Sequence, residues 1–392
     1  MNQVLNPYNP GAGARPSELA GRSNELADMD LVLQRALIGR SAKSQLITGL
    51  RGVGKTVLLH EFGRVAVKRG FIHEHIEVYD AEQLPLQLAV AVRKALLKLG
   101  GKKKAKGANR RALGVLKAFT QTFPAAASLQ IEADIVAGVA DSGDLGTDLA
   151  ALFEEVGGAA RSLEAGVFLT IDEMHHLPSA ALEALLLGLH RTSEMGLPFV
   201  LAGAGLPSLS AVSEESRVYA ERMFRFRSIG ALAADEVGKA VLGPAAAEGV
   251  SWKGAAVTRL CEVTQGYPYF IQEFAKQAWD LAEESSDMIR PGDVERSIPL
   301  AVMELDQGFF QFRAGKTTDP ERAYLRAMAE LGPGIVRSAD VATLLHKKTT
   351  QVAPVRDALM KKAICFSPRF NELAFTFPMF DQFMKRWIPQ FS

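Results

Sequence analysis

The residues with the clearest chemical potential form one glycine-rich stretch, Gly49 to Thr56, which reads Gly-Leu-Arg-Gly-Val-Gly-Lys-Thr. The stretch fits the phosphate-loop pattern G-x-x-x-x-G-K-[ST] without a mismatch. Glycines let the backbone curl so that successive N–H groups point at phosphate oxygens. In this pattern Lys55 lies against the β- and γ-phosphates, and the Thr56 hydroxyl is a ligand of Mg²⁺. A glycine-rich turn without function is the alternative, and the complete pattern favours the nucleotide site.

The segments on either side of this loop have to place it. Ser44–Thr48 is predicted to be a short strand, and Val57–Ala66 has apolar residues at helical spacing. The N-terminus of such a helix adds its positive dipole end to a phosphate site. We therefore expect ATP, with Mg²⁺, as the ligand. The residues of this segment that we expect to bind it are Gly49, Arg51, Gly52, Val53, Gly54, Lys55, Thr56 and Val57.

A second chemical pair, Asp172 and Glu173, directly follows the apolar run Gly166–Ile171. Such a run is consistent with a buried parallel strand. An acidic residue at the carboxyl end of that strand lies beside the phosphate loop, where Asp172 would hold Mg²⁺. Glu173 is then placed to orient or deprotonate the attacking water, which gives it a catalytic role with Lys55.

Two histidines, His175 and His176, come next on a predicted turn. Imidazoles are common ligands of zinc, but a zinc site needs at least three protein ligands. No third ligand is evident from the sequence. We therefore expect these histidines to be supporting or surface residues rather than a metal site.

The composition limits the broad class of the protein. The chain has 392 residues, enough for two or three domains, and its net charge of +1 indicates no global attraction to nucleic acid or membrane. Its two cysteines are far apart, which argues against a disulfide framework or a thiolate metal site. Because neither a signal pattern nor an apolar run of about eighteen residues is present, we expect a cytoplasmic protein without a membrane partner.

Strands alternate with helices up to about residue 230, which predicts a doubly wound α/β layer. The expected strands beyond those named are 72–78 and 197–202, and the expected helices are 23–36, 85–99, 144–160 and 178–191. After Gly230 the pattern is almost purely helical, with helices expected at 233–242, 252–264, 269–284 and 293–307. We predict three domains: an α/β domain at 1–230 that begins with an extended arm, a helical lid at 231–312, and a domain at 319–392.

Two segments have more than one interpretation. Residues 100–112 are rich in lysine, arginine and glycine and are predicted to be a surface loop, which either is simply solvated or contacts a phosphate backbone. Residues 113–140 fit either a hairpin or two short helices.

The last segment predicts three helices, 321–331, 339–345 and 353–362, followed by strands 364–367 and 372–377. This order is that of a winged helix-turn-helix. Residues 319–392 carry eleven Lys and Arg against seven Asp and Glu. Double-stranded DNA is the expected partner, and a protein-docking role is the alternative. The predicted DNA contacts are Lys347, Lys348, Thr350, Arg356, Lys361 and Arg369; Lys362 belongs to the same basic cluster.

The motifs in this order resemble the AAA+ ATPases, in particular their origin-recognition or initiator-like, archaeal-type branch with a C-terminal winged helix. They are Gly21-Arg22, Gly49–Thr56, Ile171–Glu173, Leu201–Pro207, Arg222 and Gly266–Tyr269. The resemblance implies that the helical lid packs over the nucleotide and that Arg22 and Pro268 lie beside it. It also implies that Arg222 is an arginine finger presented to a neighbouring subunit; a role without catalysis is the alternative. Arg225 and Arg227 are expected on the solvent face of a strand.

This sequence departs from the family pattern at two places. The first sensor is normally polar, yet Ala202-Gly203-Ala204 offers no such side chain. The second sensor is usually an arginine, and the matching position lies near Tyr269, in a Gly-x-Pro pattern closer to the STAND signalling ATPases. Positioned donors to the transferring phosphate carry much of the rate, so we expect slow or partner-stimulated hydrolysis.

Three functional hypotheses follow. The first is an ATP-dependent switch that binds DNA and assembles into a homo-oligomer. The second is a STAND-like signalling ATPase whose lid and winged helix bind a protein partner. The third is nucleotide binding without turnover.

Overall fold

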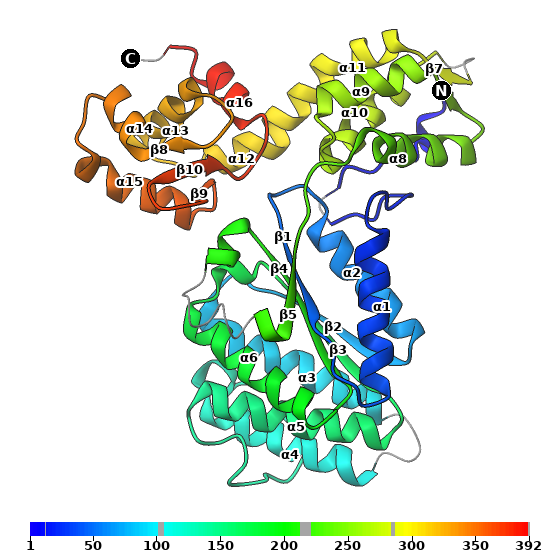
Figure 1. The fold of residues 1–392 in the computed structure, drawn as a ribbon, viewed down its shortest axis with the longest axis vertical. Helices are drawn as coiled ribbons and strands as arrows, with labels where there is room; N and C mark the ends of the chain where they lie inside the picture. The colour runs from blue at the N-terminus through cyan, green and yellow to red at the C-terminus, as the bar shows by residue number, and fades with distance from the viewer. Residues whose placement is uncertain (12, 101–105, 212–220, 284–286, 391–392) are drawn as a thin grey trace. The chain divides into compact units, whose positions relative to one another are not determined.

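The structure is a computed structural model that describes residues 1–11, 13–100, 106–211, 221–283 and 287–390. The chain forms two compact units (Figure 1). One, here called the α/β unit, contains Arg22–Gly49 and Lys55–Ile229. The other, here called the helical unit, contains Met1–Gly21, Leu50–Gly54 and Gly230–Ser392. The finer division into three domains stays a prediction.

A five-stranded parallel sheet forms the centre of the α/β unit, with strand order β2-β3-β4-β1-β5. The strands are β1 Ser44–Thr48, β2 Phe71–Glu77, β3 Gly166–Asp172, β4 Phe199–Gly205 and β5 Phe224–Ser228. Every residue of β1, β3 and β4 is buried. Burial at every position, rather than at alternate ones, is what a sheet covered on both faces requires. The predicted α/β class is confirmed.

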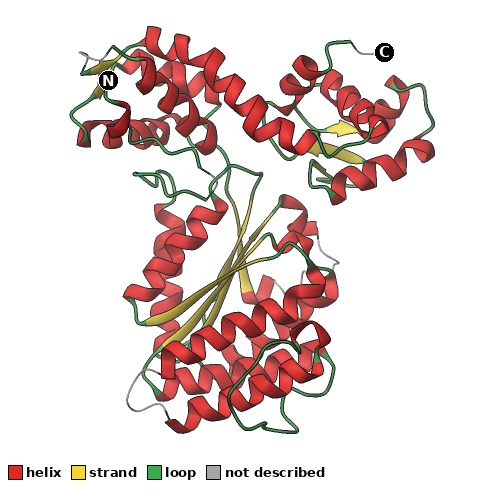
Figure 2. Ribbon diagram, turned by 180° about the vertical axis from the view of Figure 1, so that it is seen from behind, coloured by secondary structure: helices red, strands yellow, loops and turns green. Residues whose placement is uncertain are grey.

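Helices cover both faces of this sheet, with α1 and α2 on one side and α3 to α6 on the other (Figures 1 and 2). They are α1 Ser23–Leu37, α2 Lys55–Lys68, α3 Leu84–Gly100, α4 Lys106–Thr122, α5 Leu145–Ser162 and α6 Ser179–Glu194. The described part of this unit also contains the 3-10 turns η2 Ala81–Gln83, η3 Pro124–Ala126, η4 Met174–His176 and η5 Pro207–Ala211. The short turn η4 follows β3 closely and carries the two histidines.

Two local predictions in this unit are wrong. The basic segment 100–112 is a surface loop only in part, because α4 begins at Lys106; residues 101–105 lie outside the described chain. The reason is a buried face at helical spacing, made by Ala112, Val115, Leu116 and Phe119. In segment 113–140, the part up to Thr122 belongs to the single helix α4. Only the short turn Pro124–Ala126 follows it in this described segment, so the segment is neither a hairpin nor two short helices.

In the helical unit, the described part of the chain after Gly230 starts with four helices. They are α8 Ala234–Ala247, α9 Gly254–Thr264, α10 Pro268–Leu281 and α11 Pro291–Glu304. A small parallel ladder joins β6 Ser251–Trp252 to β7 Met288–Ile289. The helical path then continues through the π-helical η6 Leu305–Phe310 into α12 Gln311–Ala314. The predicted end of the last lid helix at 307 therefore comes too early.

The C-terminal module has three helices and a small sheet in the predicted order, with one further strand and one further helix. It comprises α13 Asp319–Leu331, β8 Val336–Arg337, α14 Ser338–Leu344, α15 Thr349–Lys361, β9 Cys365–Phe366, β10 Glu372–Phe375 and α16 Phe380–Trp387. The sheet order is β8-β10-β9, and both pairings are antiparallel. Helix α15 starts four residues before the predicted 353, and Pro354 lies inside it.

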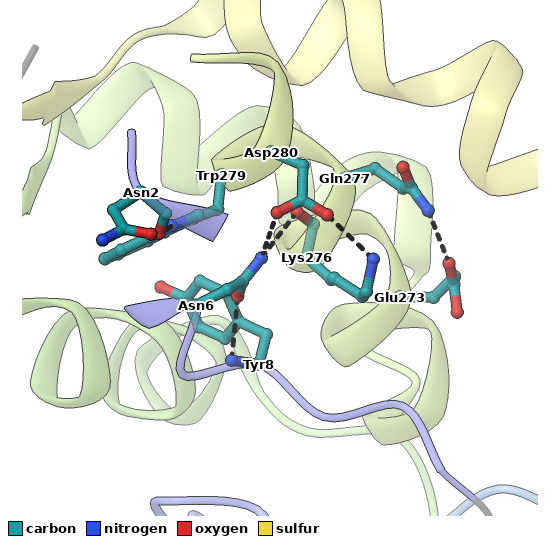
Figure 3. A network of polar contacts seen from close by, with 8 residues as sticks. All are labelled: Asn2, Asn6, Tyr8, Glu273, Lys276, Gln277, Trp279 and Asp280. Carbon is teal, nitrogen blue, oxygen red and sulfur yellow. Dashed lines mark hydrogen bonds and ion pairs between the residues drawn. The ribbon is translucent and has the colours of Figure 1, made fainter. Parts of the chain in front are cut away.

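The N-terminal arm is folded onto the helical unit (Figure 3). Tyr8 is 3% exposed, its hydroxyl donates to the Val241 carbonyl at 2.8 Å, and its ring packs in edge-to-face geometry with Trp252 and Trp279. The Asn6 amide donates to Asp280 at 2.8 Å and also to a backbone carbonyl of α10. The arm lacks a core of its own and completes the core of the helices.

Candidate functional site

The phosphate loop lies between β1 and α2, as its sequence predicts. Gly52 and Gly54 have φ angles of 84° and 90°, in the left-handed region that glycine adopts without strain. Lys55 is the first residue of α2 and is 6% exposed, and its Nζ donates to the Gly49 carbonyl at 3.0 Å. The ammonium is thus held at the start of the helix, where α2 directs its first N–H groups.

Thr56 and Asp172 come together although 116 residues separate them. The Thr56 hydroxyl donates to Oδ2 of Asp172 at 2.5 Å, and Oδ1 of the same carboxylate accepts the Glu173 N–H at 2.7 Å. Asp172 is the last residue of β3 and is 3% exposed. A hydroxyl and a carboxylate side by side are oxygen ligands of the kind that Mg²⁺ binds, so these residues fit the expected ion.

Glu173 has an unusual backbone conformation, with φ 55° and ψ 32°. A residue other than glycine in the left-handed region carries strain, and such residues concentrate at functional sites. This conformation ends β3 and starts η4. The Glu173 Oε2 lies 3.3 Å from Nδ1 of His175, which also receives the Leu206 N–H at 3.4 Å.

The small residues at the position expected for a first sensor have a structural counterpart. Gly203 lies on β4 between β1 and β3, and a Cβ at this position would lie 2.0 Å from the Met174 sulfur. Met174 itself is fully buried. The thioether occupies the volume that a polar side chain at 203 would need, so the small residues of this strand are matched to the turn η4. No sequence pattern assigns this role to Met174.

Three further histidines gather around Thr170 of β3, and no sequence motif singles them out. His73 Nε2 and His75 Nδ1, both on β2, lie 2.8 Å and 2.9 Å from the Thr170 hydroxyl of β3. The His60 ring of α2 meets the His75 ring edge-on at 4.6 Å. Burial lowers the pKa of His73 to about 4, with smaller contributions from the positive charges of His75, His60 and Lys98. Burial likewise lowers the pKa of His75.

The arginines before and within β5 divide into two groups. Arg222 is exposed and lies two residues before the strand; the segment 212–220 lies outside the described chain. Arg225 and Arg227 both form ion pairs with Asp28 of α1, and Arg225 does so at 2.9 Å. These two arginines hold α1 against the edge of the sheet. They therefore have a structural role in addition to the expected position on the solvent face of a strand.

Arg22 and Pro268 belong to different units. Arg22 is 8% exposed and occupies the cap position of α1, which begins at Ser23. Pro268 is the first residue of α10. Within the helical unit, the Tyr269 N–H donates to the Gly52 carbonyl at 3.2 Å, and the Arg51 N–H donates to the Thr376 carbonyl at 3.1 Å. The segment Leu50–Gly54 thus forms backbone hydrogen bonds both with α10 and with the C-terminal module.

Most of the predicted DNA contacts lie on the surface of the C-terminal module. The exposed members are Lys347, Lys348, Thr350, Lys361 and Arg369. Arg356 is only 26% exposed and pairs with Asp357 at 2.8 Å. Lys362 pairs with Glu321 at 2.6 Å and is committed to the packing of the module. Phe370, beside Arg369 in the turn between β9 and β10, is 91% exposed, and the sequence alone assigns it no role.

Comparison with known families identifies two parts of the chain. Residues 18–201 match the AAA ATPase domain family, and residues 307–384 match a domain of unknown function (DUF8462). A search of the curated proteins gives no match. No helix in the part of the chain that the structure describes is long and apolar enough to span a membrane.

Solved structures with a similar fold cover almost the whole chain. The Walker-type ATPase paby2304 of Pyrococcus abyssi is 16% identical over 95% of this chain and 97% of its own, with a TM-score of 0.55. Cdc6p from Pyrobaculum aerophilum is 14% identical over 99% and 98%, with a TM-score of 0.49. The Aeropyrum pernix Orc1 protein, solved in complex with DNA, is 16% identical over 95% and 94%, with a TM-score of 0.47. At these identities the likeness concerns the fold alone.

Proposed function

We propose that the protein is an ATP-binding and ATP-hydrolysing switch of the AAA+ type, with slow or partner-stimulated turnover. The observation that carries this proposal is the contact between Thr56 and Asp172 next to the buried Lys55. Two predicted Mg²⁺ ligands from separate elements meet at the start of the helix that follows the phosphate loop. The match of residues 18–201 to the AAA ATPase domain supports the same interpretation.

Each side chain then has a defined task. Mg²⁺-ATP, when bound, supplies a γ-phosphoryl group whose negative charge the metal partly neutralises. Lys55 would bind phosphate oxygens, and Thr56 and Asp172 would hold the ion. Glu173 accepts a proton from the attacking water at its carboxylate. Because Met174 fills the place of a polar sensor at Gly203, one donor to the transferring phosphate is missing, which favours slow turnover.

The exposed position of Arg222 supports a role in a neighbouring subunit. A guanidinium supplied in trans stabilises charge in the transition state, so hydrolysis would rise with assembly into a homo-oligomer. We place this ATP-dependent assembly in the cytoplasm, where the two widely spaced cysteines stay reduced.

For the C-terminal module we propose a winged helix that binds double-stranded DNA. Support comes from its element order and from the exposed cations on the approach to α15 and in the turn between β9 and β10. In a winged helix these are the places that meet phosphates and a groove. Arg356 and Lys362 contribute less to the proposed surface, because they form ion pairs with Asp357 and Glu321.

A STAND-like signalling role is the second candidate. The observation that favours it is the pair of backbone hydrogen bonds from Arg51 to Thr376 and from Tyr269 to Gly52. They tie the phosphate-loop segment 50–54 to α10 and to the C-terminal module, so that bound nucleotide could control the exposure of a protein-binding surface.

The test is phosphate release at increasing protein concentration, with and without duplex DNA, for wild type and Lys55→Ala. A specific rate that climbs with concentration and with DNA, and that vanishes in the variant, supports the DNA-coupled oligomeric switch. ATP binding with a flat, negligible rate supports the signalling alternative. DNA binding that does not weaken steeply with salt would contradict the phosphate contacts.

A further inference from the structure

Three side chains around the turn η4 form a cluster that the proposed ATPase chemistry does not use as a unit. Glu173, His175 and His176 each offer one ligand atom, and these atoms lie within 4.8 Å of one another. The side chains of Glu173 and His175 are 18% and 7% exposed, so the cluster is largely withdrawn from water. A third ligand beside the two histidines is not evident from the sequence; in the structure Glu173 supplies it.

The backbone explains why these three converge. Glu173 leaves β3 in a left-handed conformation, and the chain then makes one 3-10 turn in which the His176 N–H donates to the Glu173 carbonyl at 3.0 Å. Met174 points the other way, into the core against Gly203. The two histidine rings lie on the same side, with centroids 4.2 Å apart.

The spacing and the donor types suit a particular class of ion. Nδ1 of His175 lies 3.3 Å from Oε2 of Glu173, and a metal bound there would replace the long, 3.4 Å hydrogen bond that this nitrogen accepts from the Leu206 N–H. Two ligands of a tetrahedral zinc ion, with bonds of about 2.0–2.1 Å, are about 3.3 Å apart. Two imidazoles and one carboxylate favour zinc and similar transition metals, whereas Mg²⁺ prefers oxygen ligands alone. The cluster therefore prefers a different metal ion from the one that the neighbouring Thr56 and Asp172 prefer.

We propose that Glu173, His175 and His176 form a binding site for a divalent transition metal of the zinc class, with a water as the fourth ligand. A metal there uses the carboxylate of Glu173, which then no longer accepts a proton from water. Occupancy therefore switches hydrolysis off; this consequence, unlike the binding itself, rests on the proposed ATPase function.

The binding test needs neither nucleotide nor turnover. Zn²⁺ is titrated into the metal-free full chain against a chromophoric chelator, for wild type, His175→Ala, His176→Ala and the control His190→Ala. His190 is a half-exposed histidine of α6 that lies 3.2 Å from Glu194. We expect one equivalent of tightly bound Zn²⁺ in wild type and in the control. Each of the other two variants should lose more than about tenfold in affinity, since loss of a residue that only supports a ligand already costs about tenfold to a hundredfold. Equal affinity in all four proteins would overturn the site.

A second measurement on wild type alone covers the case in which a variant does not fold. Co²⁺ added to the metal-free chain should give the intense visible absorption of a tetrahedral site, and one equivalent of Zn²⁺ should abolish it. A weak spectrum typical of hydrated or octahedral Co²⁺ would contradict the proposed ligand set.

The functional consequence is tested separately. With Mg²⁺ in excess, one equivalent of Zn²⁺ should suppress phosphate release by wild type, and a chelator should restore it. His176→Ala should hydrolyse ATP but resist Zn²⁺. Inhibition that is equal in wild type and His176→Ala would contradict the switch. Absence of any hydrolysis in wild type would instead count against the proposed ATPase and leave the metal-binding result standing.

Discussion

The phosphate site of the α/β unit and the basic surface of the C-terminal module differ in how their residues are held. Lys55 and Asp172 are buried and hydrogen-bonded, and Asp172 ends a strand that is buried at every residue. Lys347, Lys348 and Arg369 are exposed side chains outside the helices and strands. The function of the first site depends on positions that the sheet fixes. The function of the second depends only on where positive charges lie on the surface. Substitutions should therefore have large, specific effects in the first and small, additive effects in the second.

The largest effect is expected for Asp172→Asn. The amide keeps the shape but removes the charge that faces the ion, so phosphate release should fall by about 10²–10³-fold. Asp30→Asn is the matched control, because Asp30 pairs with Arg69 on the surface of the same unit at 2.6 Å. Turnover should be unchanged there. A comparable loss in both variants would mean that burial and geometry do not set Asp172 apart.

The buried histidines beside Thr170 predict acid sensitivity of the α/β unit. The pKa of His73 is about 4 in the folded chain and near 6.5 when it is exposed, so the unfolded chain binds more protons between these values. The contribution of His73 to the free energy of unfolding should be fully present above pH 6.5. It should decrease as the pH falls toward 4, by up to about 3 kcal/mol. Urea unfolding at pH 7 and pH 4.5 measures this; His73→Gln should show a flatter dependence, and an identical one would contradict the assignment.

The same histidine depends on a glycine in the facing helix. A Cβ at Gly63 would lie 2.2 Å from the His73 ring. Gly63→Ala should therefore destabilise the fold by about 1–3 kcal/mol, despite the better helix propensity of alanine. In Gly158→Ala of α5 the new Cβ meets nothing within 4 Å, so that variant should be neutral or slightly stabilised. Thermal unfolding of both variants checks the contrast.

The smallest effects are expected on the surface of the C-terminal module. Lys347→Ala with Lys348→Ala should leave the thermal stability unchanged and should reduce the salt slope of DNA binding by roughly one unit for each phosphate that the variant no longer binds. Lys253→Ala, which replaces an exposed lysine before α9, serves as the control. Fluorescence anisotropy at several salt concentrations gives both slopes. Equal slopes in the two variants would place any DNA-binding surface elsewhere.

The fold is predictable from the sequence where the local pattern and the tertiary structure agree. Strand β1 matches its predicted bounds to the residue, and β3 and α2 lie where an apolar run, a glycine loop and a helical repeat indicate them. The α/β class follows from the same alternation. The match of Gly203 to Met174 is not predictable in this way, because it depends on how closely a turn approaches a neighbouring strand.

The errors have physical causes of the same kind. Charge makes the start of α4 resemble a loop, although its buried face is fixed by packing on the α/β core. The helix expected to start at 353 begins instead at Thr349, because Pro354, a residue typical of a first helical turn, lies inside the helix. Glu173 is predicted only to activate water, and its approach to His175 and His176 is missed, because a sequence shows neighbours along the chain and not the direction of side chains.

In the proposed mechanism Glu173 activates water beside a nucleotide held by Lys55, Thr56 and Asp172. The most direct test compares ATP binding and phosphate release in wild type and Glu173→Gln. We predict an ATP Kd within about twofold of wild type and phosphate release lowered by about 10²–10⁴-fold, because the amide cannot accept the proton. Unchanged phosphate release in Glu173→Gln, with ATP binding intact, would contradict this role of Glu173.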